Sequence, residues 1–182
     1  MRSERRRSID VDGHLHELTF STYRRVKALE IPHCAYIFLQ SLARAREALA
    51  FELYAYVVMP EHIHLLLRPK DGGKISGVLK YVKQSSSKRI LAHLNEIRPT
   101  YMQRFMVVGP DGSSANRFWQ SGGGYDRNLI SEKAIVASLN YIHANPVTRG
   151  LCEFVSDWPY SSARAYMDGL GDPPLDVDQL VL

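Results

Sequence analysis

Two histidines separated by one residue, His62 and His64, interrupt an apolar stretch, MPEHIHLLLRP (residues 59–69). In a β-strand both imidazoles would project to one face, while Ile63 and alternate leucines would project to the other. Two imidazoles on one face can hold one metal ion, but such a pair more often forms ordinary hydrogen bonds within a half-buried sheet. No cysteine, aspartate or third histidine lies nearby in the sequence. The pair alone therefore leaves both interpretations open.

A second candidate group lies in YIHANPVTRGL, residues 141–151. Tyr141 and Asn145 are four residues apart, so in a helix they share one side. A tyrosine hydroxyl can act as a nucleophile, although a tyrosine near a helix end more often packs or caps. That side is turned away from the apolar stripe of the helix, which consists of Ile135, Leu139 and Ile142.

Three other histidines invite the same question. His143 is two residues from Tyr141, about 200° around a helix, so we assign it a structural role. His14 and His16 form another His-x-His in a more polar strand. We interpret that second pair as hydrogen-bonding within the sheet.

Composition places limits on the class of protein. A chain of 182 residues, 45% of them hydrophobic, is the size of one domain. Cys34 and Cys152 are isolated, so they form neither a disulfide framework nor a Cys-x-x-Cys zinc signature. No signal peptide and no apolar run of the roughly 18 residues of a membrane span is present, so we expect a cytoplasmic, nucleoid-associated protein without a membrane partner.

Charge is unevenly distributed along the chain. The whole chain carries a formal +4 and the last fifteen residues carry −4, so residues 1–167 carry +8. A polyanion such as nucleic acid is a natural partner for this basic part, although +8 also suits ordinary solubility. We expect one domain over 1–182, with a core at about 13–167, a basic start at 1–12 and an acidic tail at 168–182.

Hydrophobic periodicity predicts the elements that position these residues. Segment 98–118 reads as a loop or small hairpin, and Asn145-Pro146 is expected to end the last helix. The order β-α-β-β-α-β-β-α predicts an α+β fold, a ferredoxin-like antiparallel sheet of about four to five strands with helices packed on it. Strands are expected in 13–23, 51–59, 62–69 and, interrupted by a glycine-rich bend, twice in 118–130; helices are expected in 34–50, 75–96 and 132–144.

Taken together, the motifs resemble those of the single-tyrosine HUH transposases, most closely the REP-associated tyrosine transposases. The resemblance rests on YVVMPEHIHLLLRP, FWQSGGGYDRNL, LNYIHANPVTRGL and SDWPYSSARAY, in that order, and it covers most of residues 13–167. As a set these motifs are specific, because each alone is weak but their order and spacing are typical of the group.

The resemblance implies a role for each residue. His62 and His64 match the metal-binding pair, Asn145 matches a position that completes the metal site, and Tyr141 matches the nucleophile. The ion would be Mg²⁺ or Mn²⁺, which keeps several waters and so accepts a sparse ligand set. Tyr141 would cleave single-stranded DNA at hairpin repeats through a 5′-phosphotyrosine and rejoin it without a nucleotide cofactor. Tyr125, which follows three glycines, is then a bystander.

Basic and aromatic residues are candidates for DNA contacts. A solvated helix face explains any one of the basic residues nearly as well. Trp119, Tyr125 and Trp158 could stack on bases, but we assign both tryptophans to the core. The candidate phosphate contacts are Arg5, Arg6, Arg7, Lys80, Lys83, Lys88 and Arg89.

Two other function classes remain as alternatives. One is a non-catalytic nucleic-acid-binding module of ferredoxin-like fold, which would normally expose aromatic side chains on its sheet rather than histidines. The other is a two-metal hydrolase, which usually needs a larger barrel and more His and Asp ligands. The sequence leaves the target DNA open, and it fits either a monomer or a homodimer.

Overall fold

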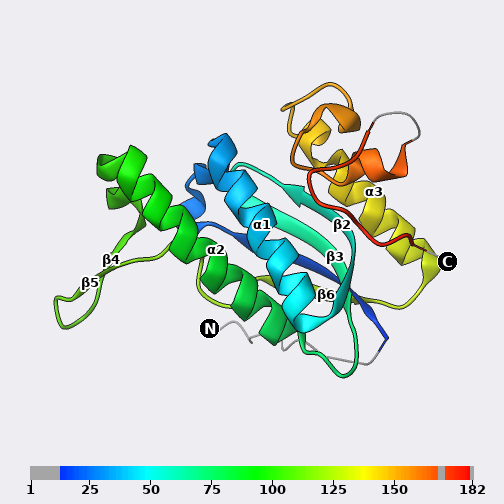
Figure 1. The fold of residues 1–182 in the computed structure, drawn as a ribbon, viewed down its shortest axis with the longest axis horizontal. Coiled ribbons are helices and arrows are strands. Elements are labelled where there is room, and N and C mark those ends of the chain that lie inside the picture. Colours follow the sequence, from blue (N-terminus) through cyan, green and yellow to red (C-terminus); the bar gives the residue numbers. More distant parts are fainter. Residues whose placement is uncertain (1–12, 168–170, 181–182) are drawn as a thin grey trace, which may run out of the picture.

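The computed structural model describes residues 13–167 and 171–180. Its centre is a four-stranded antiparallel sheet with the strand order β2-β3-β1-β6 (Figure 1). The sheet strands are β1 (Leu15–Ser21), β2 (Phe51–Val58), β3 (His62–Pro69) and β6 (Tyr125–Leu129), and the helices are α1 (Pro32–Leu49), α2 (Ile75–Ile97) and α3 (Glu132–Thr148).

The connections follow the ferredoxin-like pattern that the sequence predicts. Helix α1 joins β1 to β2, and α2 leads from β3 to the segment that ends in β6. The connection through α1 skips one strand position, which β3 fills, and the connection through α2 skips one position, which β1 fills. Strands β3 and β1 are antiparallel neighbours. Helices α1 and α2 lie side by side on the same face of the sheet (Figure 1). The predicted α+β class and number of sheet strands are confirmed.

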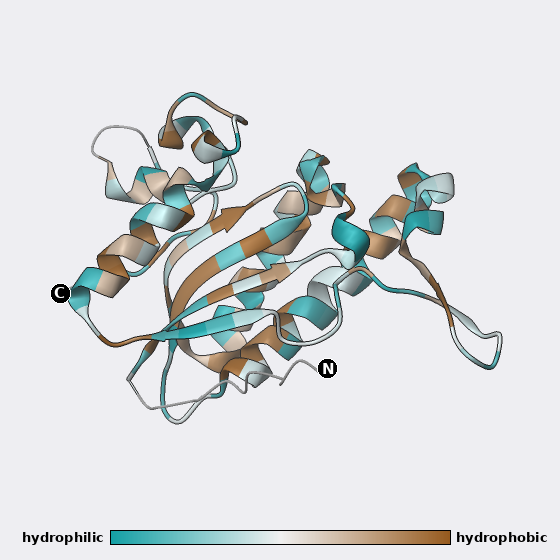
Figure 2. Ribbon diagram, turned by 180° about the vertical axis from the view of Figure 1, so that it is seen from behind, coloured by the Kyte–Doolittle hydropathy of each residue, from teal (hydrophilic) through white to brown (hydrophobic). Residues whose placement is uncertain are grey.

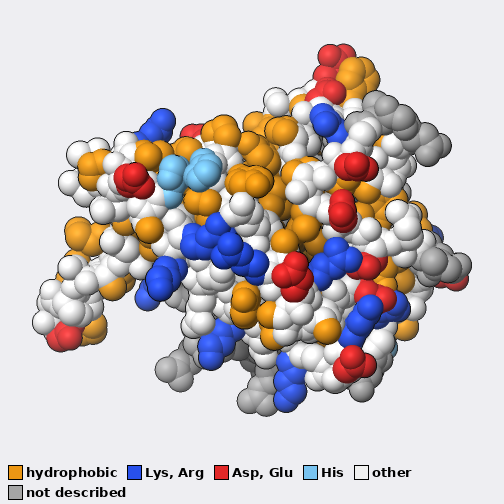
Figure 3. All heavy atoms as spheres, viewed as in Figure 1, with side chains coloured by type: hydrophobic (Ala, Val, Ile, Leu, Met, Phe, Trp, Pro, Cys, Tyr) orange, Lys and Arg blue, Asp and Glu red, His pale blue; other side chains and the backbone are white. Residues whose placement is uncertain are grey.

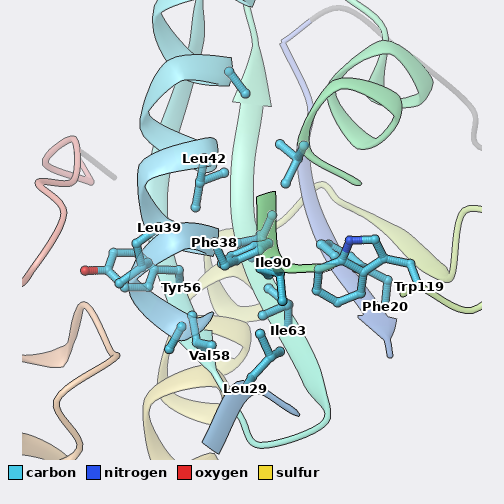
Figure 4. Close-up of a cluster of buried hydrophobic side chains, with 14 of the residues drawn as sticks. Phe20, Leu29, Phe38, Leu39, Leu42, Tyr56, Val58, Ile63, Ile90 and Trp119 are labelled. Carbon is cyan, nitrogen blue, oxygen red and sulfur yellow. The ribbon is translucent and has the colours of Figure 1, made fainter. Parts of the chain in front are cut away.

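The main core lies between the sheet and these two helices. Ile63, Leu65 and Leu67 of β3 all point into it, as their alternation predicts. Figure 4 shows Phe38 of α1 close to Ile63 and Ile90 of α2, with Phe20 and Trp119 at one side. Each fully buried side chain of this size contributes roughly 1.5–3 kcal/mol, so this layer fixes the position of β3.

Helix α3 packs on the opposite face of the sheet, mainly against β2 (Figure 2). Its Ile135 and Ile142 join Val57 and Leu66 in a second apolar cluster, with Leu139 partly buried beside them. The predicted apolar stripe of this helix is therefore confirmed. Because His62 and His64 alternate with the core residues of β3, they share this second face with α3.

Residues 118–120 do not form a strand of the sheet, so the prediction of two strands in 118–130 was wrong. Phe118 and Trp119 are adjacent yet both are buried in the main core, which breaks the alternation a strand requires. Only an isolated bridge joins Thr22 to Trp119. The small hairpin predicted in 98–118 is confirmed, as strands β4 (Met106–Val108) and β5 (Ser114–Asn116) that follow a 3-10 helix (Pro99–Phe105).

The prediction that Asn145-Pro146 ends the last helix was also wrong, because α3 continues to Thr148. Proline removes one N–H donor, but the final turn keeps its other bonds. The Arg149 N–H donates to the Asn145 carbonyl at 3.1 Å, and the Leu151 N–H donates to the Pro146 carbonyl at 2.9 Å. The helical conformation therefore extends through Asn145.

The free edge of β2 is covered by residues near the C-terminus. The Val58 N–H donates to the Tyr160 carbonyl at 2.9 Å, and the Ser162 N–H donates to the Tyr56 carbonyl at 3.0 Å. Further along, the acidic segment 171–180 lies against the same strand, where Asp178 contacts Leu53 through both backbone and side chain. Within the described ranges, no helix has the length and apolar character needed to cross a bilayer.

Candidate active site

His62 and His64 lie on β3, on the face that α3 covers. Both are buried, and their ring centroids are 4.8 Å apart. In the antiparallel register, Ser21 of β1 is opposite His62 and Thr19 is opposite His64. The apolar core behind β3 and the strand beside it thus fix both imidazoles in one small region.

The His64 ring is held at both of its nitrogens. Its Nδ1 is 2.8 Å from the Thr19 hydroxyl, and its Nε2 is 3.3 Å from the Asn145 side-chain amide nitrogen. Burial, reinforced by the neighbouring His62, lowers the pKa of His64 to about 3. Burial also lowers the pKa of His62, although the negative charge of Glu61 acts to raise it. Both rings are therefore neutral at neutral pH, the form in which imidazole binds metals.

Helix α3 brings the other two predicted site residues to this point. Because the helix continues past Pro146, Asn145 lies one turn after Tyr141 on the same side. The Tyr141 ring meets His64 edge-on, with centroids 5.4 Å apart and planes at 88°. Asn145 is buried, whereas Tyr141 is 53% exposed. A buried polar group thus adjoins a hydroxyl that solvent and a substrate can reach.

Glu61 is a central residue of the site that the sequence analysis did not single out. Its Oε1 accepts from Arg25 at 2.9 Å and from Arg149 at 3.0 Å, and lies 3.2 Å from His62 Nδ1. Its Oε2 is buried and has no hydrogen-bond partner among the described residues. Glu61 therefore ties the loop after β1, the end of α3 and His62 together.

Burial alone would raise the pKa of Glu61. The bond from Arg149, with further contributions from His62 and Arg25, outweighs burial and holds the pKa below its ordinary value. The sequence signal that could have identified Glu61 is a carboxylate directly beside a histidine pair in an otherwise apolar stretch.

The remaining histidines and Tyr125 have other positions. His143 points away from Tyr141, and its Nε2 is 2.9 Å from the Ser162 hydroxyl, in agreement with a structural role. His16 is buried and contacts Asp126 at 2.8 Å within the sheet. Tyr125 lies on β6 opposite Thr19.

The candidate DNA contacts differ in their availability. Lys83 donates to the carbonyls of Gln120 at 3.0 Å and Gly122 at 2.7 Å, and burial lowers its pKa to about 8. Arg89 joins α2 to α1 through Gln40 and Ser41, and burial, together with the charge of Arg44, lowers its pKa. Lys80 and Lys88 are exposed on α2. Lys and Arg side chains gather in the middle of the face formed by α1 and α2 (Figure 3); Arg5, Arg6 and Arg7 lie outside the described residues.

Both tryptophans pack within the fold, as predicted. Trp119 is buried and donates to the Ser86 hydroxyl at 3.0 Å. Trp158 is partly buried and donates to the Val58 carbonyl at 2.9 Å. Tyr125, 41% exposed, is the one of the three aromatic candidates that remains open to solvent.

The sequence is similar to a known protein family and to a named relative. Residues 11–145 match the family described as "Transposase IS200 like". A REP-associated tyrosine transposase of Haemophilus influenzae is 30% identical over 135 residues, which is 68% of this chain and 69% of that protein.

One solved structure shows the same fold. The structure of a REP-associated tyrosine transposase bound to a REP hairpin superimposes with a TM-score of 0.68 at 20% identity, covering 99% of this chain and 100% of that one. A transposase from Deinococcus radiodurans gives a TM-score of 0.47 at 21% identity, covering 78% and 95%. Since the family match spans well over half of the sequence, this chain belongs to the IS200-like transposase family.

Proposed function

We propose that the protein cleaves and rejoins single-stranded DNA at hairpin repeats, with Tyr141 as the nucleophile. The observation that carries this proposal is the placement of Tyr141. Its ring contacts His64, and one helical turn later Asn145 reaches the same imidazole. A solvent-accessible hydroxyl beside a buried, oriented group of ligand-type side chains is the arrangement that nucleophilic attack on a phosphodiester requires.

The chain's own atoms account for both halves of the reaction. In cleavage, the Tyr141 hydroxyl loses its proton and attacks phosphorus, the P–O3′ bond breaks, and the leaving 3′-oxygen takes up a proton. This step leaves the DNA joined to Tyr141 through its 5′-phosphate. In rejoining, a 3′-hydroxyl loses its proton and attacks the same phosphorus, the bond from phosphorus to the Tyr141 oxygen breaks, and that oxygen takes up a proton. The bond energy stays in the phosphotyrosine, so no nucleotide is consumed.

The donor set fits a hard divalent cation. Thr19 contacts Nδ1 of His64, which leaves Nε2 for a metal, and turning the Asn145 amide would present its oxygen instead of its nitrogen. Among the described residues no three His, Cys, Asp or Glu side chains form a metal-binding group. A sparse set of imidazoles and an amide suits an ion that keeps its waters, and the unpartnered Oε2 of Glu61 could accept from one of them.

We assign the metal to His62, His64 and Asn145. Bound there, Mg²⁺ or Mn²⁺ would polarise the scissile phosphodiester as a Lewis acid. The residues around it orient the ligands: Thr19 holds His64, and Glu61 holds His62.

The choice of substrate rests on charge and on the solved relative. The first 167 residues carry a formal +8, which suits a polyanion. The relative with the same fold is bound to a REP hairpin. We therefore propose hairpin DNA with single-stranded flanks as the substrate of this chain.

The decisive experiment is a covalent trapping assay. The protein is incubated with single-stranded DNA carrying the hairpin repeats that flank its gene, in Mn²⁺ or Mg²⁺, and denatured before electrophoresis. Wild type should give a protein–DNA adduct. Tyr141→Phe removes only the hydroxyl, so it should abolish the adduct and leave DNA binding near wild type.

Tyr125→Phe is the matched control. Tyr125 is also exposed and lies on β6 opposite Thr19, so it is a second tyrosine hydroxyl near the site that does not come from α3. An adduct that persists in Tyr141→Phe and disappears in Tyr125→Phe would contradict the proposal. Excess chelator, and separately His64→Ala, should also abolish the adduct; full activity in chelator would refute the metal assignment. A protein that binds the hairpin but never forms an adduct would be a binding module.

A further inference from the structure

A second group of side chains adjoins the site without belonging to it. The Tyr23 ring is contacted by two guanidinium groups, from Arg24 at 5.0 Å and from Arg117 at 5.8 Å. Both distances are within the range of cation–π attraction, which holds the planar groups against the ring. These three residues are called the arginine–tyrosine patch below.

Backbone hydrogen bonds connect this patch to the candidate active site. Thr22 donates to the Glu61 carbonyl through its N–H at 2.9 Å and its hydroxyl at 3.1 Å. The next residue, Tyr23, donates its N–H to the Phe118 carbonyl at 2.7 Å. The loop after β1 therefore joins the residue beside His62 to the base of the β4–β5 hairpin, where Arg117 follows β5.

The loop directs two successive arginines to different places. Arg24 and Arg25 both have left-handed backbone conformations, with φ of 52° and 53°, which residues with a side chain rarely adopt. Arg25 binds the buried carboxylate of Glu61 at 2.9 Å, whereas Arg24 lies against Tyr23. One arginine thus supports the active site and the other is presented to solvent.

The patch carries charge that the described part of the fold does not neutralise. Arg24 and Arg117 are exposed, and no acidic side chain among the described residues pairs with either. Other arginines of the molecule do have such partners: Arg46 binds Asp178 and Arg68 binds Glu52. Two exposed, oriented and unpaired guanidinium groups are suited to an anionic ligand.

A hollow continues from Arg117. It has a volume of about 800 Å³ and lies between α2 and the hairpin. Its lining includes Ser87, Lys88, Asn116 and Gln120, which can contact phosphate and sugar oxygens without reading sequence. A strand bound at the patch would meet this hollow beside Arg117.

We propose that the arginine–tyrosine patch binds the single-stranded DNA next to the cleaved phosphodiester. Arg24 and Arg117 contact backbone phosphates, and the aromatic and guanidinium planes stack on unpaired bases. This inference rests on the proposed function, because it names the part of the same substrate that the patch receives. A half-buried aromatic ring flanked by exposed planar cations favours a single strand, since paired bases do not offer their faces.

The test compares two DNA ligands by fluorescence anisotropy, one a blunt hairpin and the other the same hairpin with a single-stranded flank. Arg24→Ala and Arg117→Ala should each weaken binding of the flanked hairpin about tenfold and leave the blunt hairpin nearly unchanged. Each lost phosphate contact should also reduce the log–log salt slope by about 0.7. Arg117→Lys should keep the salt slope but lose part of the affinity, because lysine lacks the planar group.

Arg104→Ala is the matched control. Arg104 is exposed and lies over Tyr101 at 5.1 Å, the same kind of pair on the 3-10 helix before β4. The Arg104→Ala variant should bind both DNA ligands like wild type. Circular dichroism of every variant checks that the fold is retained.

Three outcomes would overturn the inference. Patch variants that bind like Arg104→Ala show that the patch does not contact DNA. Equal weakening toward blunt and flanked hairpins shows that it contacts duplex rather than single strand. Wild type that binds neither ligand removes both this inference and the proposed function. If the patch variants weaken the flanked hairpin while wild type forms no Tyr141 adduct, the inference stands and the proposed chemistry fails.

Discussion

Gly124 sets how closely β6 can approach β1, and replacing it should be costly. Its φ is +85°, and a Cβ built there would lie 2.2 Å from the Thr19 carbonyl oxygen and 3.0 Å from the Phe20 Cβ. Carbon–oxygen contacts normally begin near ~3.3 Å, so β6 would have to move by about 1 Å. That movement would disturb the strand pair beside Thr19, the residue that holds His64.

The expected loss for Gly124→Ala can be built from two parts. A left-handed conformation costs a residue with a Cβ about 1–2 kcal/mol. Displacing β6 weakens backbone hydrogen bonds worth about 1 kcal/mol each, and with two affected the total reaches roughly 3–4 kcal/mol. Gly122 is a control in the same loop, because its φ is +87° but a Cβ there meets no atom within 4 Å. Gly122→Ala should therefore lose only the first part, about 1–2 kcal/mol.

Urea unfolding followed by circular dichroism measures both variants. The midpoint of Gly124→Ala should fall clearly below that of Gly122→Ala, with similar slopes. Equal midpoints would show that the approach of β6 to β1 relaxes at no cost, and the steric part of the reasoning would be refuted.

Two further predictions concern side chains. Thr19→Val removes the hydroxyl at 2.8 Å from His64 Nδ1 and keeps the shape, so affinity for the proposed Mg²⁺ or Mn²⁺, measured by calorimetry, should fall about 10- to 100-fold; unchanged affinity would contradict the orienting role. Arg68 lowers the pKa of Glu52 to about 2, below the ordinary 4.5. The stability from this pair is therefore present above about pH 4.5 and lost as the pH falls toward 2, because the unfolded chain takes up the proton first. Glu52→Gln should thus be less stable than wild type by about 1–2 kcal/mol at pH 7 and equally stable near pH 2 in urea titrations; a difference independent of pH would contradict this.

Local patterns were sufficient to predict most of the framework. The period-2 alternation of β3 predicts that Ile63, Leu65 and Leu67 enter the core and that both histidines face away from it. The order of strands and helices predicts the ferredoxin-like sheet. Segment 118–120 was mispredicted because its apolar side chains look like a strand, whereas Phe118 and Trp119 fill the core from an irregular loop.

The site was only partly predictable because its contacts join distant segments. Thr19 and His64 meet through the β1–β3 register, which no local pattern specifies. Glu61 gains its importance from Arg25 and Arg149, which come from two other elements.

One local rule also failed. The rule that proline disfavours helix in the preceding residue ended α3 too early, although Asn145 remains helical. The contacts of Lys83 with the Gln120 and Gly122 carbonyls could not be predicted from its helix face either, because they join distant segments.

The covering of the β2 edge by the C-terminal segments has a consequence for synthesis of the chain. Tyr56 and Ser162, which pair at that edge, are 106 residues apart. At 5–20 residues per second, the ribosome makes the covering segment roughly 5–20 s after the strand. Throughout that interval the N–H and C=O groups of β2 are open to pairing with another nascent chain. Synthesis of the covering residues therefore ends the period in which neighbouring polypeptides on one messenger RNA can join edge to edge.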